Sequence, residues 1–221
     1  MREHKTISIA DQIFDRLEKE ILSGKYKRGE IVSENKLAES LGVSRTPVRE
    51  AVKRLEQEGI IEDCSKGFRI IGITRDDMPD MYEIRIQIES LAAGRAAENI
   101  SVDELKEMGE ILDMQKYYID RQNGEGTDNS ENIKDLDSRF HNLIYISSRS
   151  KAFADMLIPL HKRMTKFRKA SVRKNSRAQS SWNEHNEIYT ALREHNIAWA
   201  EEAMRRHLIN ARDSIMTIEE E

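Results

Sequence analysis

The chain of 221 residues is long enough to form one large domain or two small domains, each with a hydrophobic core. Hydrophobic residues make up 38% of it and charged residues 34%, which is typical of a soluble, helix-rich protein. No apolar run approaches membrane-spanning length and the N-terminus lacks the apolar segment of a signal peptide, so we expect a cytoplasmic protein without a membrane partner. The single cysteine, Cys64, excludes an internal disulfide and fits a reducing compartment.

The net charge of −4 conceals a difference between two parts of the chain. Residues 1–75 contain 15 basic and 13 acidic residues, a net charge of +2, whereas residues 76–221 contain 21 and 27, a net charge of −6. This asymmetry is consistent with a DNA-facing first part joined to a part that does not face DNA.

Three helices are expected in the first part. An apolar residue at every fourth position predicts a helix over residues 8–23. A second helix is predicted from Ser33 to Leu41, with Gly42 at its C-terminal cap. Ser44 is a suitable N-cap for a third helix, so two short helices meet across a tight turn. This arrangement is a helix-turn-helix, in which the second helix reads DNA.

The third helix carries one apolar stripe and, on a different face, Arg45, Arg49 and Lys53 at every fourth position. A short helix with cations along one side fits the major groove, where arginine can contact guanine edges or phosphates. Taken alone, a basic helical face is more commonly only a solvated surface. We expect DNA contacts from Ser44, Arg45, Thr46, Arg49 and Lys53.

A β-hairpin is expected after the third helix. Ile60-Ile61 begins one strand, Ser65-Lys66-Gly67 makes a turn, and Phe68 to Ile71 forms the returning strand. The hairpin would be the wing of a winged helix. We expect Lys66 to contact the DNA backbone or minor groove and Gly67 to let the tip approach DNA closely.

The segment from Leu37 to Ala51 (LAESLGVSRTPVREA), followed by LEQEG at residues 55–59, resembles the N-terminal domain of GntR-family transcription regulators. The resemblance extends from about Ile9 to Ile71. It implies a winged helix-turn-helix DNA-binding domain over residues 1–74 and double-stranded operator DNA as the partner. One reader helix contacts few base pairs, so we expect a homodimer on a pseudo-palindromic site.

The second part shows only helix signals, and the overall fold class is therefore mainly α. Capping boxes are expected at Ser101 with Glu104 and at Ser181 with Glu184, and residues 123–129 form the clearest loop. Residues 75–221 are predicted to form an all-helical bundle of six or seven helices. The six clear helices are expected over residues 76–98, 102–122, 130–148, 151–175 (with a kink at Pro159), 181–194 and 198–217.

Histidines lie on apolar faces of three of the predicted helices. Asp137 and His141 share one helix face, and His185 and His207 lie in apolar stripes of two others. If they converge, three imidazoles and a carboxylate suit zinc, nickel, manganese or iron. The alternative is three separately hydrogen-bonded core histidines. The remaining histidines are interpreted as surface or helix-end residues: His4, His161 and His195.

Asp137-x-x-x-His141, Glu184-His185 and His207-Leu208 resemble the metal-ligand positions of the FCD effector-binding domain in the FadR-like branch of GntR regulators. The resemblance covers about residues 78–217 and implies that Asp137, His141, His185 and His207 bind a divalent metal beside a small organic acid effector. It also implies a dimerisation role for the domain. Acyl-CoA-binding members generally lack the full ligand set, which argues against a fatty-acyl effector.

Arg85 is the candidate for holding the effector. It lies on an apolar helix face, where an unpaired guanidinium is costly to bury and a carboxylate would satisfy it with two hydrogen bonds. It also matches an arginine in the family's Arg-x-x-(Leu or Ile)-Glu segment. The alternative is an internal ion pair with Glu89, one turn away.

Together these features predict a ligand-responsive transcription regulator, a repressor of a metabolic operon, that binds its operator as a homodimer. Two alternatives remain at this level. The metal itself could be the signal, or the histidine site could belong to a metal-dependent enzyme with a DNA-binding appendage. No further acid, base or nucleophile lies at a recognisable spacing, which disfavours an enzyme.

Overall fold

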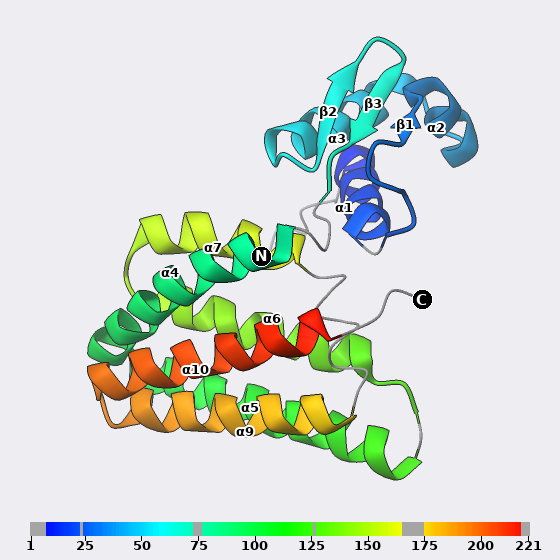
Figure 1. Cartoon of the computed structure of the whole chain (residues 1–221). Coiled ribbons are helices and arrows are strands. Elements are labelled where there is room, and N and C mark those ends of the chain that lie inside the picture. Colours follow the sequence, from blue (N-terminus) through cyan, green and yellow to red (C-terminus); the bar gives the residue numbers. More distant parts are fainter. Residues whose placement is uncertain (1–7, 23, 73–76, 126, 165–174, 218–221) are drawn as a thin grey trace, which may run out of the picture. The chain divides into compact units, whose positions relative to one another are not determined.

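A computed structural model of the chain describes residues 8–22, 24–72, 77–125, 127–164 and 175–217 (Figure 1). The chain divides into two compact units, Met1–Thr74 and Arg75–Glu221. None of the helices in the described ranges is long and apolar enough to cross a membrane.

The first unit contains three helices and a small sheet. Gly42 ends the second helix with a left-handed backbone (φ 65°, ψ 31°), as its position at the expected C-terminal cap predicts. The elements are α1 (Ile9–Leu22), β1 (Ile31–Val32), α2 (Glu34–Leu41), α3 (Arg45–Gln57), β2 (Ile61–Cys64) and β3 (Gly67–Ile70).

The sheet is antiparallel, with strand order β1-β3-β2. Cys64 pairs with Gly67 across a two-residue turn, and Val32 pairs with Phe68 on the other side of β3. The buried stripes of α1 and α3 pack together with the inward side chains of the hairpin in one core. The fold is thus a winged helix-turn-helix. It has one additional strand, β1, which was not predicted because it is only two residues long.

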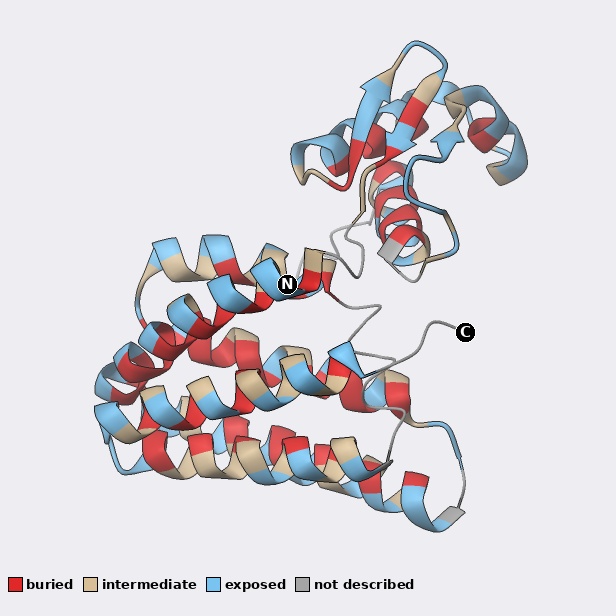
Figure 2. Ribbon diagram, viewed as in Figure 1, coloured by how far each residue is buried: buried red, intermediate tan, exposed pale blue. Residues whose placement is uncertain are grey.

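The second unit is an all-helical bundle. Its core is formed by the inward faces of the helices, whose outward faces are exposed (Figure 2). The elements are α4 (Met78–Asn99), α5 (Val102–Glu125), α6 (Ser130–Ser147), α7 (Lys151–Arg163), α9 (Asn175–Arg193) and α10 (Ile197–Met216).

Small side chains line the contact between α4 and α10. Ala93 and Ala97 on α4 and Ala200 on α10 are fully buried in the core. Gly94 faces Glu201, and a Cβ atom at Gly94 would lie 2.5 Å from the Glu201 Oε1 atom. The backbones of the two helices therefore approach closely at these residues.

Several predicted boundaries differ from the structure. Helix α5 continues to Glu125, into the expected loop, and α9 begins at Asn175, six residues before its expected start. Ser181 is therefore buried inside α9 and caps nothing, whereas the capping box at Ser101 is present as predicted. Helix α7 ends at Arg163, with Met164 as its C-cap, and not at residue 175 as expected; residues 165–174 of the expected range lie outside the described residues.

Candidate functional sites

Helix α3 has one buried and one cationic face. Val48, Ala51 and Leu55 are completely buried against the winged-helix core, which holds the helix in place. Arg45 and Lys53 are exposed on the other side, one helical turn either side of Arg49, and within the described residues neither makes an ion pair. The cationic face is therefore available to an anionic partner.

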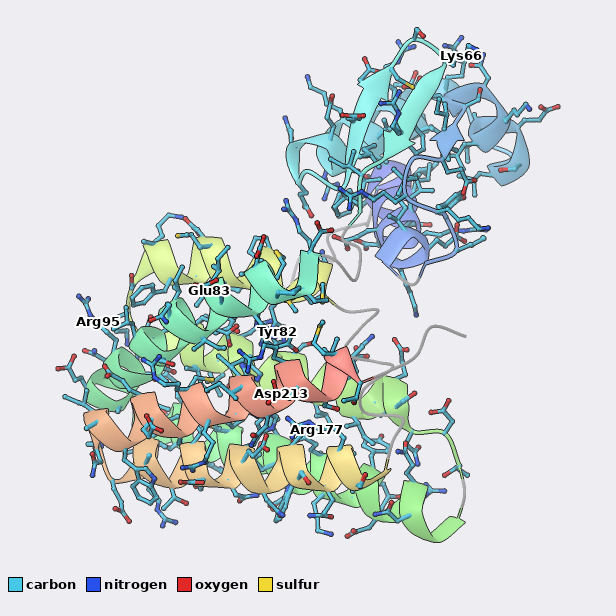
Figure 3. All side chains as sticks on the ribbon, in the orientation of Figure 1. Lys66, Tyr82, Glu83, Arg95, Arg177 and Asp213 are labelled. Atoms are coloured by element: carbon cyan, nitrogen blue, oxygen red, sulfur yellow. The ribbon has the colours of Figure 1, made fainter. Side chains whose placement is uncertain are left out.

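The cationic face of α3 borders an open hollow of about 590 Å³, which is also lined by the first turn of α2 and by the wing. Lys66 lies at the wing tip, where Figure 3 labels it. Arg49 also lies in the hollow, and its Nε atom is 3.5 Å from a carboxylate oxygen of Glu34. Ser44 and Thr46 are exposed at the start of the helix. Ser44 occupies the N-cap position, but its side chain makes no capping hydrogen bond to the described backbone.

Gly67 has an intramolecular reason to be glycine. Its φ angle is +135°, and a Cβ atom would lie 2.1 Å from the Val32 carbonyl oxygen. The absence of a side chain therefore lets β1 pair with β3. Close approach to DNA, the role predicted from the sequence, is not needed to account for this residue.

The bundle brings together the four residues predicted to bind a metal. Asp137 and His141 come from α6, His185 from α9 and His207 from α10. All four are buried, and the candidate ligand atoms of the three histidines lie within 4.8 Å of one another. The Oδ1 atom of Asp137 is 3.5 Å from Nε2 of His185. The histidines therefore form one cluster, not three separate sites.

Each imidazole of this cluster has an oxygen partner for its Nδ1 atom. A carboxylate or amide oxygen can only accept, so each Nδ1 atom donates its proton and the lone pair remains on Nε2. Metal-binding histidines are commonly oriented in this way. The Nδ1–oxygen distances are 3.1 Å from His141 to Glu89, 3.1 Å from His185 to Gln115 and 2.7 Å from His207 to Glu184.

The protonation states also suit a metal. Burial lowers the pKa of all three imidazoles, that of His207 to about 4, so they are neutral near pH 7. The buried Nε2 atom of His185 makes no hydrogen bond to any described residue, which is costly unless a ligand occupies the centre. Neutral imidazoles beside a carboxylate are a ligand set that zinc and related divalent ions accept. The residues present therefore fit a metal.

Glu184 on α9 links His207 on α10 to Arg177. Burial raises the pKa of its carboxyl group, but hydrogen bonds from His207 and Arg177 outweigh that effect and hold the pKa at about 2. Arg177 donates to both oxygens, at 2.8 and 2.9 Å. The predicted capping role of Glu184 is therefore wrong: the residue orients His207 and is itself held by Arg177.

Arg85 forms the internal ion pair that the sequence offered as an alternative. Its Nε atom donates to Glu89 at 2.5 Å, and the two side chains are 2% and 1% exposed. Its Nη2 atom also lies 3.4 Å from Nδ1 of His161. Glu89 in turn accepts from His141, so Arg85 is connected to the metal-ligand cluster through a single carboxylate.

His161 is a member of the site that the sequence analysis missed. It lies in the last turn of α7, which ends earlier than expected, but it is 2% exposed, so its interpretation as a surface residue is wrong. Its ring centroid is 4.7 Å from that of His141, and Nε2 is 3.7 Å from Oδ2 of Asp137. The spacing of Leu157, His161 and Met164 marks a buried helix face and could have identified it.

The other two histidines lie away from the cluster or outside the described part. His195 follows the end of α9, is exposed and has a positive φ of 51°, which confirms its interpretation as a helix-end residue. Its Nδ1 atom lies 2.7 Å from the Ala97 carbonyl oxygen. His4 lies outside the described residues.

A cavity of about 30 Å³ adjoins the cluster. Its lining includes Arg85, Asp137, His141 and His207 together with Tyr82 and Arg177, the last two labelled in Figure 3. This volume holds one or two water molecules and is too small for an organic acid. A ligand larger than water therefore requires the surrounding side chains or helices to move.

A winged helix-turn-helix joined to a helical bundle with a buried histidine cluster defines the class of the protein, a DNA-binding regulator. Comparison with known proteins agrees. Residues 9–67 match the model for bacterial regulatory proteins of the gntR family, and residues 80–210 match the FCD domain. The chain belongs to the GntR family and is a transcription regulator, not an enzyme.

Individual relatives support this assignment. The chain is 31% identical to the uncharacterized HTH-type transcriptional regulator YdhC of Bacillus subtilis over 199 residues, 90% of this chain and 85% of the relative. It is 40% identical to the gluconate operon transcriptional repressor of Bacillus licheniformis over 100 residues, 45% of this chain and 41% of the repressor. The solved structure of Escherichia coli McbR/YncC has the same fold, with a TM-score of 0.75, 21% identity and coverage of 96% of this chain and 98% of that one.

Proposed function

We propose that this regulator represses a metabolic operon by binding a pseudo-palindromic operator as a homodimer, with α3 in the major groove. The exposed cationic face of α3, continued by the wing, carries this proposal. The gluconate operon repressor, similar over part of its length, supports repression and a metabolic operon. Residues 1–74 would bind DNA and residues 75–221 would bind the effector and dimerise.

The DNA contacts can be tested on a duplex selected from a random-sequence pool with the wild-type protein. Replacing Arg45 or Arg49 with alanine should weaken binding to this duplex by about 1–3 kcal/mol. Arg16→Ala is the control, because Arg16 is 59% exposed but lies on α1. Equal affinities of all these proteins would reject α3 as the reader helix.

We further propose that Asp137, His141, His185 and His207 bind a divalent metal, either zinc, nickel, manganese or iron. The shared Nδ1–oxygen pattern and the buried Nε2 atom of His185 support this assignment. When bound, the metal would act as a Lewis acid that attracts a carboxylate. His185→Ala should abolish stoichiometric metal in protein stripped with chelator and reloaded, whereas His195→Ala should retain it. Full retention in His185→Ala would instead indicate core histidines that bind no metal.

A small organic acid is the proposed effector, and Arg85 is the proposed contact for its carboxylate. Because the cavity is only about 30 Å³, the acid must displace side chains or shift helices, which would link binding to a change in shape. A coupling free energy of about 1–3 kcal/mol is enough to change operator affinity by one to two decades. Arg85→Lys keeps the charge but loses the fork of donors. It should weaken the operator response to small hydroxy acids and dicarboxylic acids while leaving binding to DNA intact.

A metal-sensing regulator is the second candidate, and the small cavity favours it. The histidine cluster is complete without an organic ligand, and metal binding needs no additional space beside it. Titration of operator binding with zinc, nickel or manganese alone separates the two. A full response to metal without any acid would support metal sensing, and a response that requires an acid would support the effector proposal.

A further inference from the structure

His161 faces two of the residues already described, one with each ring nitrogen. Its Nδ1 atom lies 3.4 Å from Nη2 of Arg85, and its Nε2 atom lies 3.7 Å from Oδ2 of Asp137. His161 is buried, so both contacts are made inside the bundle. His161 comes from α7, Arg85 from α4 and Asp137 from α6. The ring therefore connects three helices.

The contact with Arg85 decides which nitrogen of His161 carries the proton. A guanidinium can only donate hydrogen bonds, so the Nδ1 atom that faces it must accept. The hydroxyl group of Tyr145, 3.4 Å from the same Nδ1 atom, can also donate to it. Burial lowers the pKa of His161 well below its ordinary value, so the ring is neutral near pH 7 and its single proton lies on Nε2.

This tautomer is the opposite of that of the three histidines proposed to bind a metal. Each of those rings donates from Nδ1 to an oxygen and keeps its lone pair on Nε2. His161 instead directs an N–H group towards Asp137. The Oδ1 atom of Asp137 faces His185 at 3.5 Å, so its two oxygens point to different rings. The carboxylate can therefore offer one oxygen to a metal and accept from His161 with the other.

We infer that His161 is a positioning residue, which holds Asp137 in the orientation in which its Oδ1 atom serves as a metal ligand, and that it is not itself a ligand. At 3.7 Å the contact is slightly too long for a hydrogen bond, and a small rotation of either side chain completes it. Ligating carboxylates usually have such a hydrogen-bond partner. The inference rests on the metal site of the proposed function and adds a residue to it.

Arg85 gains a second connection to the metal-ligand cluster in this arrangement. Through Glu89 it reaches His141. Through His161 it also reaches Asp137, so it is linked to two of the four proposed ligands. Glu89, His141 and His161 have candidate ligand atoms within 4.8 Å of one another, but the adjacent guanidinium would repel a second cation there.

The zinc affinity of the full chain, measured by competition with a chromophoric chelator, tests this role. His161→Leu removes the donor but keeps a side chain of similar size, and it should raise the zinc dissociation constant about 10- to 100-fold. His161→Gln keeps an N–H donor and should stay within about threefold of wild type. Leu157→Ala is the control for disturbed packing and should leave the zinc affinity unchanged, because Leu157 is buried on the same face of α7.

A ligand role and a space-filling role predict different results, and either would overturn the inference. If His161 bound the metal, His161→Gln would weaken binding as much as His161→Leu, because an amide is not a usual zinc ligand. If the ring only filled space, His161→Leu would keep the wild-type affinity. Cobalt(II) gives a second measurement, since its absorption spectrum depends on its ligands. His161→Gln should keep the wild-type spectrum, whereas His185→Ala should lose it.

A double variant tests whether His161 acts through Asp137. In an Asp137→Ala background, His161→Leu should cause no further loss of zinc affinity, because the carboxylate that it positions is gone. Losses that add in the double variant would contradict the inference. Urea unfolding of the chelator-treated variants checks that each one is folded.

The outcomes separate this inference from the metal site on which it rests. A wild-type chain that binds none of zinc, cobalt, nickel, manganese and iron would reject both. A wild-type chain that binds zinc, together with an unchanged affinity of His161→Leu, would reject only the role of His161.

Discussion

The buried pair of Arg85 and Glu89 makes each residue dependent on the other. Arg85→Ala leaves the Glu89 carboxylate buried without its cation, which should destabilise the bundle by about 3–5 kcal/mol. The neutral double variant Arg85→Met with Glu89→Gln should lose much less, because no uncompensated charge remains. Urea unfolding followed by tryptophan fluorescence measures both, since Trp182 and Trp199 both lie in the bundle. Equal stability of the two variants would contradict this account.

Gly67 allows backbone strain and steric clash to be separated. Gly67→Ala should destabilise the first unit by more than the roughly 1–3 kcal/mol of backbone strain, because its Cβ atom also meets the Val32 carbonyl oxygen at 2.1 Å. Gly29→Ala is the matched control, since Gly29 also has a positive φ, of 82°, but no atom lies within 4 Å of its added Cβ. The difference between the two in thermal unfolding measures the clash. If Gly29→Ala is equally destabilising, the packing of β1 against β3 is not the constraint.

At the scale of single elements, the start of α5 is held by one carboxylate. Burial raises the pKa of Glu104, but hydrogen bonds from Arg149 and from Ser101 outweigh that effect and hold the pKa at about 2, below its ordinary value of 4.5. A depressed carboxylate pKa stabilises the fold above pH 4.5, and this stabilisation is lost as the pH falls from 4.5 towards 2.

Glu104→Gln should therefore cost about 1–2 kcal/mol at pH 7 and progressively less between pH 4.5 and 2. Glu107→Gln on the same helix is the control, because Glu107 is 54% exposed and its carboxylate lies 3.7 Å from Arg139. Unfolding free energies measured from pH 7 to pH 3 provide the comparison. Parallel curves for wild type and Glu104→Gln would contradict the role of this carboxylate.

Elements with local signals could be predicted from the sequence. Helix α3 and the end of α2 at Gly42 follow from apolar spacing, a cap and a glycine. Strand β1 carries no such signal because it is only two residues long. The first turns of α9 carry none either; Arg177 in this segment is held by an ion pair with Glu184, two turns further along the helix. These depend on contacts that only the folded chain makes.

In the candidate site, too, some residues could be predicted from local sequence patterns and others could not. His141, His185 and His207 stand in apolar stripes, and a resemblance to known domains grouped them before the fold was available. His161 was missed because it was interpreted as a surface or helix-end residue, whereas its burial comes from packing against α4 and α6. The hydrogen-bond partner of each imidazole, such as Gln115, likewise follows only from tertiary packing.

At the scale of the whole molecule, metal should stabilise one unit and not the other. A ligand that binds only the folded state adds about 2.7 kcal/mol when present at 100 times its dissociation constant. Reloading chelator-treated protein with zinc should therefore raise the melting temperature reported by Trp182 and Trp199, which lie in the bundle. His185→Ala should remove this shift, and His195→Ala should keep it. An unchanged melting temperature in wild type would argue against a metal at the cluster.

The close contact of α4 with α10 has a mechanical consequence. Alanine and glycine at the contact let the two backbones pack closely. Neither helix can therefore slide or rotate far without moving the other helix. His207 belongs to α10, and Arg85 belongs to α4. A movement of α10 that carries His207 would therefore also move α4 and, with it, Arg85 on the other side of the site.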